Sequence, residues 1–345
     1  MRPAWLCAVG AAAITLGAAP TQAEPSIWQR AADPAVHRDA QLLSTAEILL
    51  GEYIYLRRAP DSFRRSQILQ KARRTMEREG APDSEDVQVR YHLAEIYYRL
   101  SDVERDDGRL DDAIAHLEWV AASAGPVTLR AQALHSLAIC YARLERHEDE
   151  IAANQRALTI EPDVETFSLL LANQAEGYMA RGDVRMAVLG YRASLASTPS
   201  YLMAERGVTT LWGLAVALDR SGDLDGALEQ IALARALDPN DEQLGKPSWF
   251  FVPEYDEDWY HALGHWQLGR TLDDRDDRVH AFRAAVASLR SFVERADADD
   301  PWLPLGARRL AQCEKELTRA IQRADEARRA NPREGAEAVD RSVWE

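Results

Sequence analysis

His261 and His265 have the spacing that most directly suggests chemistry, because they lie four residues apart in a segment predicted to be helical. This spacing places two imidazoles on one face of a helix, where they could chelate a metal ion. The intervening residues are Ala262, Leu263 and Gly264, so the Glu of a zinc-peptidase motif is missing. We therefore interpret the pair as surface or groove histidines and expect no bound metal.

Other motifs that could support catalysis are missing from the sequence. The acidic clusters at 106–107, 273–277 and 297–300 lack the ligand spacing and the Gly of a calcium loop. There is no Gly-rich phosphate loop after a strand and no Gly-x-Ser-x-Gly elbow. We therefore expect a protein that is not an enzyme and needs no cofactor.

One alternative stays open at this stage. Aromatic, acidic and imidazole groups occur together at Tyr255, Asp258, His261 and His265. They could form the site of an enzyme or of a small-ligand or metal-binding protein, between the loop over 244–256 and the helix over 257–269.

The helices that would position these residues are organised by a repeated spacing of Gly, four residues, Ala, eleven residues and Pro. The spacing is exact at Gly182/Ala187/Pro199 and at Gly222/Ala227/Pro239. A third copy has Gly108 and Ala113, with its Pro one residue later, at Pro126. A fourth copy keeps Pro162 but has Glu145 and Glu150 in the Gly and Ala positions. Gly readily adopts the left-handed backbone conformation that ends a helix. Ala allows two helices to cross closely, and Pro ends the second helix. Asp183 and Asp223 follow their glycines as expected N-caps of the next helix. Each copy predicts a helix pair that must stack on its neighbours.

The first helix of each pair also repeats a pattern, as Leu93-Ala94-x-x-Tyr97, Leu137-Ala138-x-x-Tyr141, Gln174-Ala175-x-x-Tyr178 and Leu214-Ala215-x-x-Leu218. With these residues the chain resembles the tetratricopeptide-repeat (TPR) family, from about Val87 to Asn240. The resemblance implies an all-α, right-handed solenoid of about six helix pairs with a C-terminal capping helix. Tyr97 and Gly108 are farther apart than the family pattern expects, so either the first helix is extended or a loop protrudes.

The N-terminus has the pattern of a secretory signal peptide over residues 1–23, with a positive end, an apolar run and a cut expected after Ala23. An uncleaved membrane anchor is the alternative. The chain that follows is predicted to comprise a polar lead (24–36), a degenerate helix pair (37–86), core repeats (87–241), an aromatic loop (242–256), a divergent repeat with a capping helix (257–330) and a tail (331–345). We expect an exported protein, periplasmic or secreted, without a later transmembrane segment.

The family resemblance also implies a concave groove that binds a protein or peptide, lined by one face of each first helix. The groove positions that we expect to contact a partner are Tyr91, Glu95, Tyr98, Arg99, His135, Arg143, Glu176, Trp212, Asp219, Arg220, His261 and His265. This set lacks the Lys and Asn of the family's chaperone-tail clamp, which makes a chaperone-tail receptor an unsuitable interpretation. Aromatic and Arg side chains suit protein recognition, although Tyr98 and Trp212 could equally pack between repeats.

The long connection before the sixth pair is aromatic where an ordinary linker would be polar. It contains Trp249, Phe250, Phe251 and Tyr255. We favour internal packing, in which the segment folds back to fill the groove or covers the divergent repeat. Contact with a partner, or with a second copy in a homo-oligomer, is the alternative.

The net charge restricts the possible partners, and the two cysteines bear on whether the chain contains a disulfide. The formal net charge of −15 opposes binding to nucleic acid, because phosphate contacts need a basic surface. Cys140 and Cys313 are expected on distant helices, and we interpret them as two buried thiols rather than a disulfide.

Overall fold

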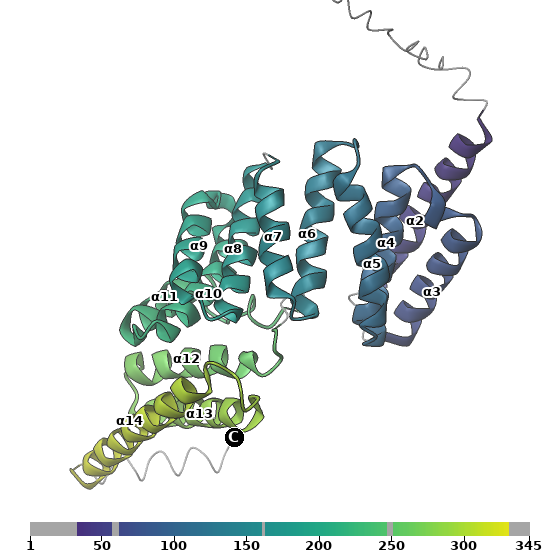
Figure 1. The fold of residues 1–345 in the computed structure, drawn as a ribbon. Coiled ribbons are helices and arrows are strands. Elements are labelled where there is room, and N and C mark those ends of the chain that lie inside the picture. The colour runs from purple at the N-terminus through teal and green to yellow at the C-terminus, as the bar shows by residue number, and fades with distance from the viewer. Residues whose placement is uncertain (1–32, 57–61, 161–162, 247–250, 331–345) are drawn as a thin grey trace, which may run out of the picture.

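The computed structural model describes residues 33–56, 62–160, 163–246 and 251–330, and its regular structure is helical throughout (Figure 1). The predicted signal peptide and tail lie outside these ranges. The α-helices are α2 (Pro34–Leu56), α3 (Ser62–Arg78), α4 (Val87–Glu104), α5 (Gly108–Ala122), α6 (Val127–Arg143), α7 (His147–Leu158), α8 (Val164–Ala180), α9 (Val184–Ser197), α10 (Val208–Arg220), α11 (Leu224–Leu237), α12 (Asp256–Thr271), α13 (Arg275–Arg295) and α14 (Leu303–Ala330). Short helical turns η1 (Ala81–Asp83), η2 (Ser200–Leu202) and η3 (Met203–Gly207) connect some of them.

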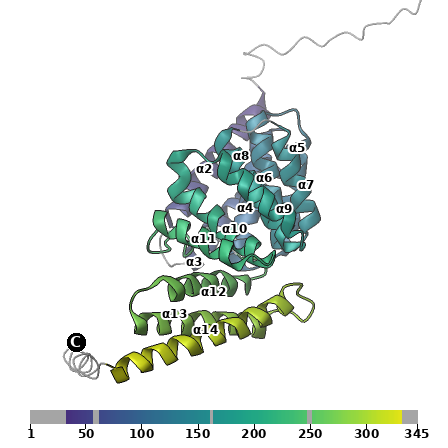
Figure 2. The ribbon, with the colours of Figure 1, turned by 90° about the vertical axis from the view of Figure 1, so that its left-hand side faces the viewer.

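The helices form pairs that stack in chain order, so the chain is an α-solenoid as predicted. Each helix packs mainly on the helices before and after it in the sequence. The pairs α4/α5, α6/α7, α8/α9 and α10/α11 form the central array, and α12, α13 and α14 form a further layer at its C-terminal end (Figures 1 and 2). Among the described helices, none combines the length and the apolarity that a membrane crossing requires.

The turns between paired helices follow the predicted chemistry in two of the repeats. Gly182 and Gly222 have φ values of 81° and 99°, in the left-handed region that favours glycine. Asp183 and Asp223 then accept hydrogen bonds from backbone N–H groups at the start of the next helix.

In the other two repeats, different residues take the left-handed position. Glu145 does so with φ 55°, although it lacks the freedom of glycine. The prediction for Gly108 is wrong, because Gly108 begins α5 and Arg105 has the positive φ of 53°. The reason is that α4 continues to Glu104, well beyond Tyr97. The extended first helix, and not a protruding loop, accounts for the long spacing in this repeat.

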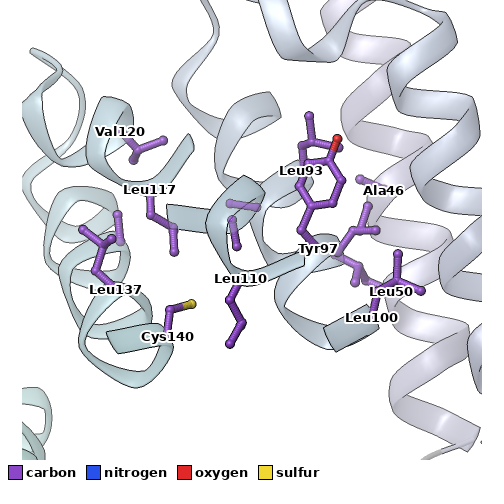
Figure 3. Packing of buried hydrophobic residues seen from close by; sticks show 14 of the residues in the cluster. Ala46, Leu50, Leu93, Tyr97, Leu100, Leu110, Leu117, Val120, Leu137 and Cys140 are labelled. Carbon is purple, nitrogen blue, oxygen red and sulfur yellow. The ribbon is translucent and has the colours of Figure 1, made fainter. Parts of the chain in front are cut away.

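The core lies at the helix crossings, where the repeat places its small residues. Ala113, Ala187 and Ala227 are fully buried, as the spacing predicts for close crossings. Figure 3 shows the adjoining packing, in which Leu93, Tyr97 and Leu100 of α4 face Ala46 and Leu50 of α2, and Leu110, Leu117, Leu137 and Cys140 continue the same cluster. Cys140 and Cys313 are both buried and free, which confirms the prediction of two thiols.

Candidate functional site

A cavity of about 390 Å³ opens between the first helices of three successive repeats. α6, α8 and α10 contribute to its wall, and α7, α9, η3, the segment after α11, and α12 complete it. Two of the groove positions expected from the sequence, His135 and Glu176, line it. Part of the wall is apolar, formed by Ala138, Ile139, Ala142, Leu169 and Ala172.

Carboxyl groups form one side of the cavity. Glu150, Glu176 and Tyr260 line both this cavity and a second one of about 20 Å³, so they stand on the partition between the two. Phe251 and Val252 lie on the far side of the partition, in the wall of the smaller cavity. The larger cavity therefore ends in a wall that carries two acidic side chains.

Glu176 is the unusual member of this wall. Burial raises the pKa of its carboxyl to about 8, and the nearby acidic groups of Glu150 and Asp256 add to the rise. Among the described residues, none donates a hydrogen bond to this carboxyl or forms an ion pair with it. A carboxyl in such surroundings holds its proton more tightly than an exposed carboxyl does.

Glu150 occupies the position that Ala takes in the other repeats. It is only 3% exposed, and its carboxyl packs against α8, where a Cβ added at Gly177 would lie 3.1 Å from Oε1. Burial raises the pKa of Glu150, opposed by His147, whose Nδ1 lies 2.9 Å from Oε2. The exception to the repeat is visible in the sequence, but Glu150 lies on a second helix and is therefore not among the expected groove positions.

Tyrosine rings complete the acidic side of the cavity. Tyr191 is 4% exposed, and its ring lies so close to α10 that a Cβ added at Gly213 would be 2.6 Å from its Cε1. Tyr260 is 3% exposed. Burial raises the pKa of both phenols well above the usual value, so both stay neutral. Neither tyrosine is among the expected groove positions, because Tyr191 lies on a second helix and Tyr260 in the divergent repeat.

The basic groups at the cavity have partners of their own. Arg206 donates from Nη1 to the backbone carbonyl of Glu165 at 2.9 Å, and the Nζ of Lys246 lies 3.8 Å from a carboxylate oxygen of Glu205. Burial lowers the pKa of His135, which favours the neutral imidazole at neutral pH. Glu176 is therefore the strongest candidate to meet a ligand's charge.

The predicted groove residues of α4 bond to α6 and to one another. Glu95 pairs with Arg99 at 2.9 Å and accepts a hydrogen bond from Ser136 at 3.0 Å. Arg143 lies over the Tyr98 ring at 5.2 Å and pairs with Asp102 at 2.7 Å. Tyr91 belongs to the same half-buried cluster, where burial and Glu95 raise its pKa. The contact of these residues with a partner stays a prediction.

The assignment of Trp212, Asp219 and Arg220 to the open groove is wrong. These residues are 1%, 0% and 6% exposed, because α12 and α14 cover this part of α10. A Cβ added at Gly264 of α12 would lie 2.9 Å from the Trp212 ring, which shows how closely the two helices cross.

Two buried networks hold these polar residues of α10. Asp219 accepts hydrogen bonds from Trp259 at 3.0 Å and from Arg309 at 2.7 Å. Arg220 pairs with Asp256 at 2.8 Å. The divergent repeat thus packs on the polar face of α10 that, by the family resemblance, would contact a partner.

The aromatic connection packs internally where the structure describes it. Phe251 lies edge-on to Tyr260, with ring centroids 5.0 Å apart, and lines the smaller cavity together with Met179. Tyr255 lies edge-on to Phe292 and donates a hydrogen bond to Asp300 at 2.8 Å. Trp249 and Phe250 lie outside the described residues.

The alternative site around the sixth pair is not assembled. Asp258 pairs with Arg295 of α13 at 2.8 Å, whereas the charged neighbours of His265 are His261, Arg235 and Asp241. The two imidazole centroids are 6.5 Å apart, and His261 Nε2 lies 3.5 Å from Glu257. Within the described ranges, no group of three or more His, Cys, Asp or Glu side chains could hold a metal ion. The helix spacing brought the histidines together, but the other proposed members face different elements.

The stacked helix pairs, the left-handed turn residues and the buried alanines define the chain as a TPR-like α-solenoid. No protein-family model matches the sequence, and no curated protein matches it. Similar solved structures include "MamA MSR-1 C2", 18% identical, covering 60% of this chain and 98% of that chain with a TM-score of 0.43. A MamA from Desulfovibrio magneticus RS-1 is 16% identical, and the match covers 59% of this chain and 97% of that chain, with a TM-score of 0.37. A tetratricopeptide repeat protein from Parabacteroides merdae ATCC 43184 is 12% identical, and the match covers 80% of this chain and 99% of that chain, with a TM-score of 0.40.

Proposed function

We propose that this protein is a noncatalytic scaffold of the cell envelope that binds protein or peptide segments along the face where the cavity opens. The observation that carries the proposal is a preformed cavity shared by the first helices of three stacked repeats. A rigid, preformed surface lowers the ordering cost of binding an extended or helical segment. The location in the envelope rests on the signal-peptide pattern of residues 1–23.

A substitution that fills the cavity tests this proposal. Ala172 is half-buried in the cavity wall, so Ala172→Trp places a large ring in the binding space. Ala196→Trp makes the same chemical change at an exposed position of α9 that does not line the cavity. Circular dichroism first establishes that both variants keep the helicity of the wild-type chain.

The measurement is affinity capture from envelope extract by the wild-type chain and by each variant, with captured proteins identified by mass spectrometry. We expect a protein that the wild-type chain and Ala196→Trp retain and that Ala172→Trp loses. Equal capture by all three forms would contradict binding at the cavity.

A small-ligand protein is the second candidate, and the size of the cavity favours it. A volume of about 390 Å³ falls in the range of ordinary small-molecule sites, roughly 300–1,000 Å³. Native mass spectrometry of the protein purified from its own envelope distinguishes the two. A retained small molecule that Ala172→Trp fails to carry would favour the ligand-binding function.

A further inference from the structure

We propose that the cavity receives one basic side chain, Lys or Arg, of the bound protein segment, with its cationic end against Glu176 and Glu150. This inference rests on the proposed function and specifies the chemistry of the partner. It does not depend on where along the solenoid the rest of the segment lies.

The shape of the cavity suits a long side chain with a charged end. Glu150 and Glu176 stand together at the partition, and the apolar residues Ala138, Ile139 and Ala172 line the cavity on other sides. An aliphatic stem can lie along such a wall while its charged end reaches the carboxyls. Neutral tyrosine rings beside the carboxyls are compatible with a cation, because aromatic faces attract positive charge.

The charged groups that act most strongly on Glu176 are the carboxyls of Glu150 and Asp256. Glu150 on α7 has His147 as its neighbour, and Asp256 on α12 is already paired with Arg220 of α10 at 2.8 Å. From α6, His135 contributes a neutral imidazole. From α9 and α12, Tyr191 and Tyr260 contribute neutral phenols. An anion placed here would face two acidic side chains, whereas a cation would supply the missing partner.

Binding of a cation should be coupled to the release of a proton. Because burial raises the pKa of the Glu176 carboxyl, this group must lose its proton to pair with an ammonium group. Between pH ~6 and pH ~9 the affinity should therefore rise with pH, by up to about tenfold per pH unit, and level off once Glu176 is ionised. A lysine side chain keeps its charge over this range, since its usual pKa is about 10.4.

The test uses the full chain and two short peptides that differ in one group. One peptide has a single central lysine among alanines, and the other has norleucine there, which keeps the stem and lacks the ammonium. n-Pentylamine serves as the free-amine probe. Dissociation constants are measured by NMR titration at pH 6, 7, 8 and 9 for the wild-type chain, for Glu176→Gln, and for Glu229→Gln, a matched change at an exposed position of α11.

We expect the lysine peptide to bind at least tenfold more tightly than the norleucine peptide at pH 8, with the pH dependence given above. Glu176→Gln should abolish both the preference and the pH dependence, while Glu229→Gln should retain them. Equal binding of the two peptides would overturn the inference about charge and leave segment binding intact.

Two further outcomes separate this inference from the proposed function. If n-pentylamine binds as tightly as the lysine peptide and with the same dependence on Glu176, the cation site exists but serves a free amine, and segment binding fails. If neither the lysine peptide nor the amine binds, the cation site is refuted. The capture experiment with Ala172→Trp then decides the proposed function separately.

Discussion

Replacing Glu176 by Gln should stabilise the protein at high pH and leave it nearly unchanged in acid. The pKa of this carboxyl rises from 4.5 to about 8 on folding, chiefly through burial. Below pH 4.5 the group is protonated in both the folded and the unfolded chain, so its contribution to stability is fully present. As the pH rises toward 8, the unfolded chain releases the proton while the folded chain holds it, and the folded state loses stability.

The size of the effect follows from the two pKa values. At ~1.36 kcal/mol per pH unit, the rise corresponds to an upper limit of about 5 kcal/mol. The cavity gives the carboxyl some access to solvent, so we expect about half of this. Between pH 5 and pH 9, the unfolding free energy of the wild-type chain should therefore fall by roughly 2 kcal/mol relative to Glu176→Gln.

Denaturant unfolding of both forms at pH 5, 7 and 9, followed by circular dichroism, measures this difference. Comparing the two forms cancels the titration of all groups that they share. Glu229→Gln, a matched change at an exposed position of α11, serves as the control. A difference between Glu176→Gln and wild type that does not change with pH would refute the raised pKa of Glu176.

Three further predictions concern the rest of the chain. Asp219→Ala should cost about 3–5 kcal/mol of unfolding free energy in denaturant titration, because it leaves the Arg309 charge without its buried partner. Adding Arg309→Met should recover part of this loss. If the losses of the two single variants simply add in the double variant, the pairing is contradicted. Gly213→Ala should destabilise by about 1–3 kcal/mol, since the new methyl group meets the Tyr191 ring; an unchanged melting temperature would contradict this close packing. N-terminal sequencing of the exported chain should begin directly after Ala23, and a retained Met1 would contradict cleavage.

The helix pairs could be predicted because each depends on local chemistry that the sequence displays. Glycine at 182 and 222, aspartate after it and alanine at the crossing each act within one repeat. The extension of α4 cannot be predicted in this way, since the same spacing allows a longer helix or a loop. Arg105 shows why the position of a turn cannot be predicted from glycine alone: a longer helix moves the left-handed residue away from Gly108.

The site was harder to predict because it depends on contacts between repeats far apart in the sequence. Groove positions from the TPR resemblance located His135 and Glu176 in the cavity. The same reasoning failed for Asp219 and Arg220, because it could not show that α12 and α14 pack on α10 and supply Arg309 and Asp256 as partners. A family groove presumes an open array, and here the last three helices close its end.

The departure at Glu150 suggests how such a site can be found in other solenoids. A repeat protein needs a small residue where paired helices cross, so a glutamate there removes a good packing residue and adds a desolvation cost. In this chain the cost is reduced locally, by Gly177 on the facing helix and by the hydrogen bond with His147. The same departure places a second acidic group beside Glu176, at the end of the cavity. An exception to the repeat that adds charge and is accommodated by its neighbours is therefore a better guide to the binding site than the positions that obey the repeat.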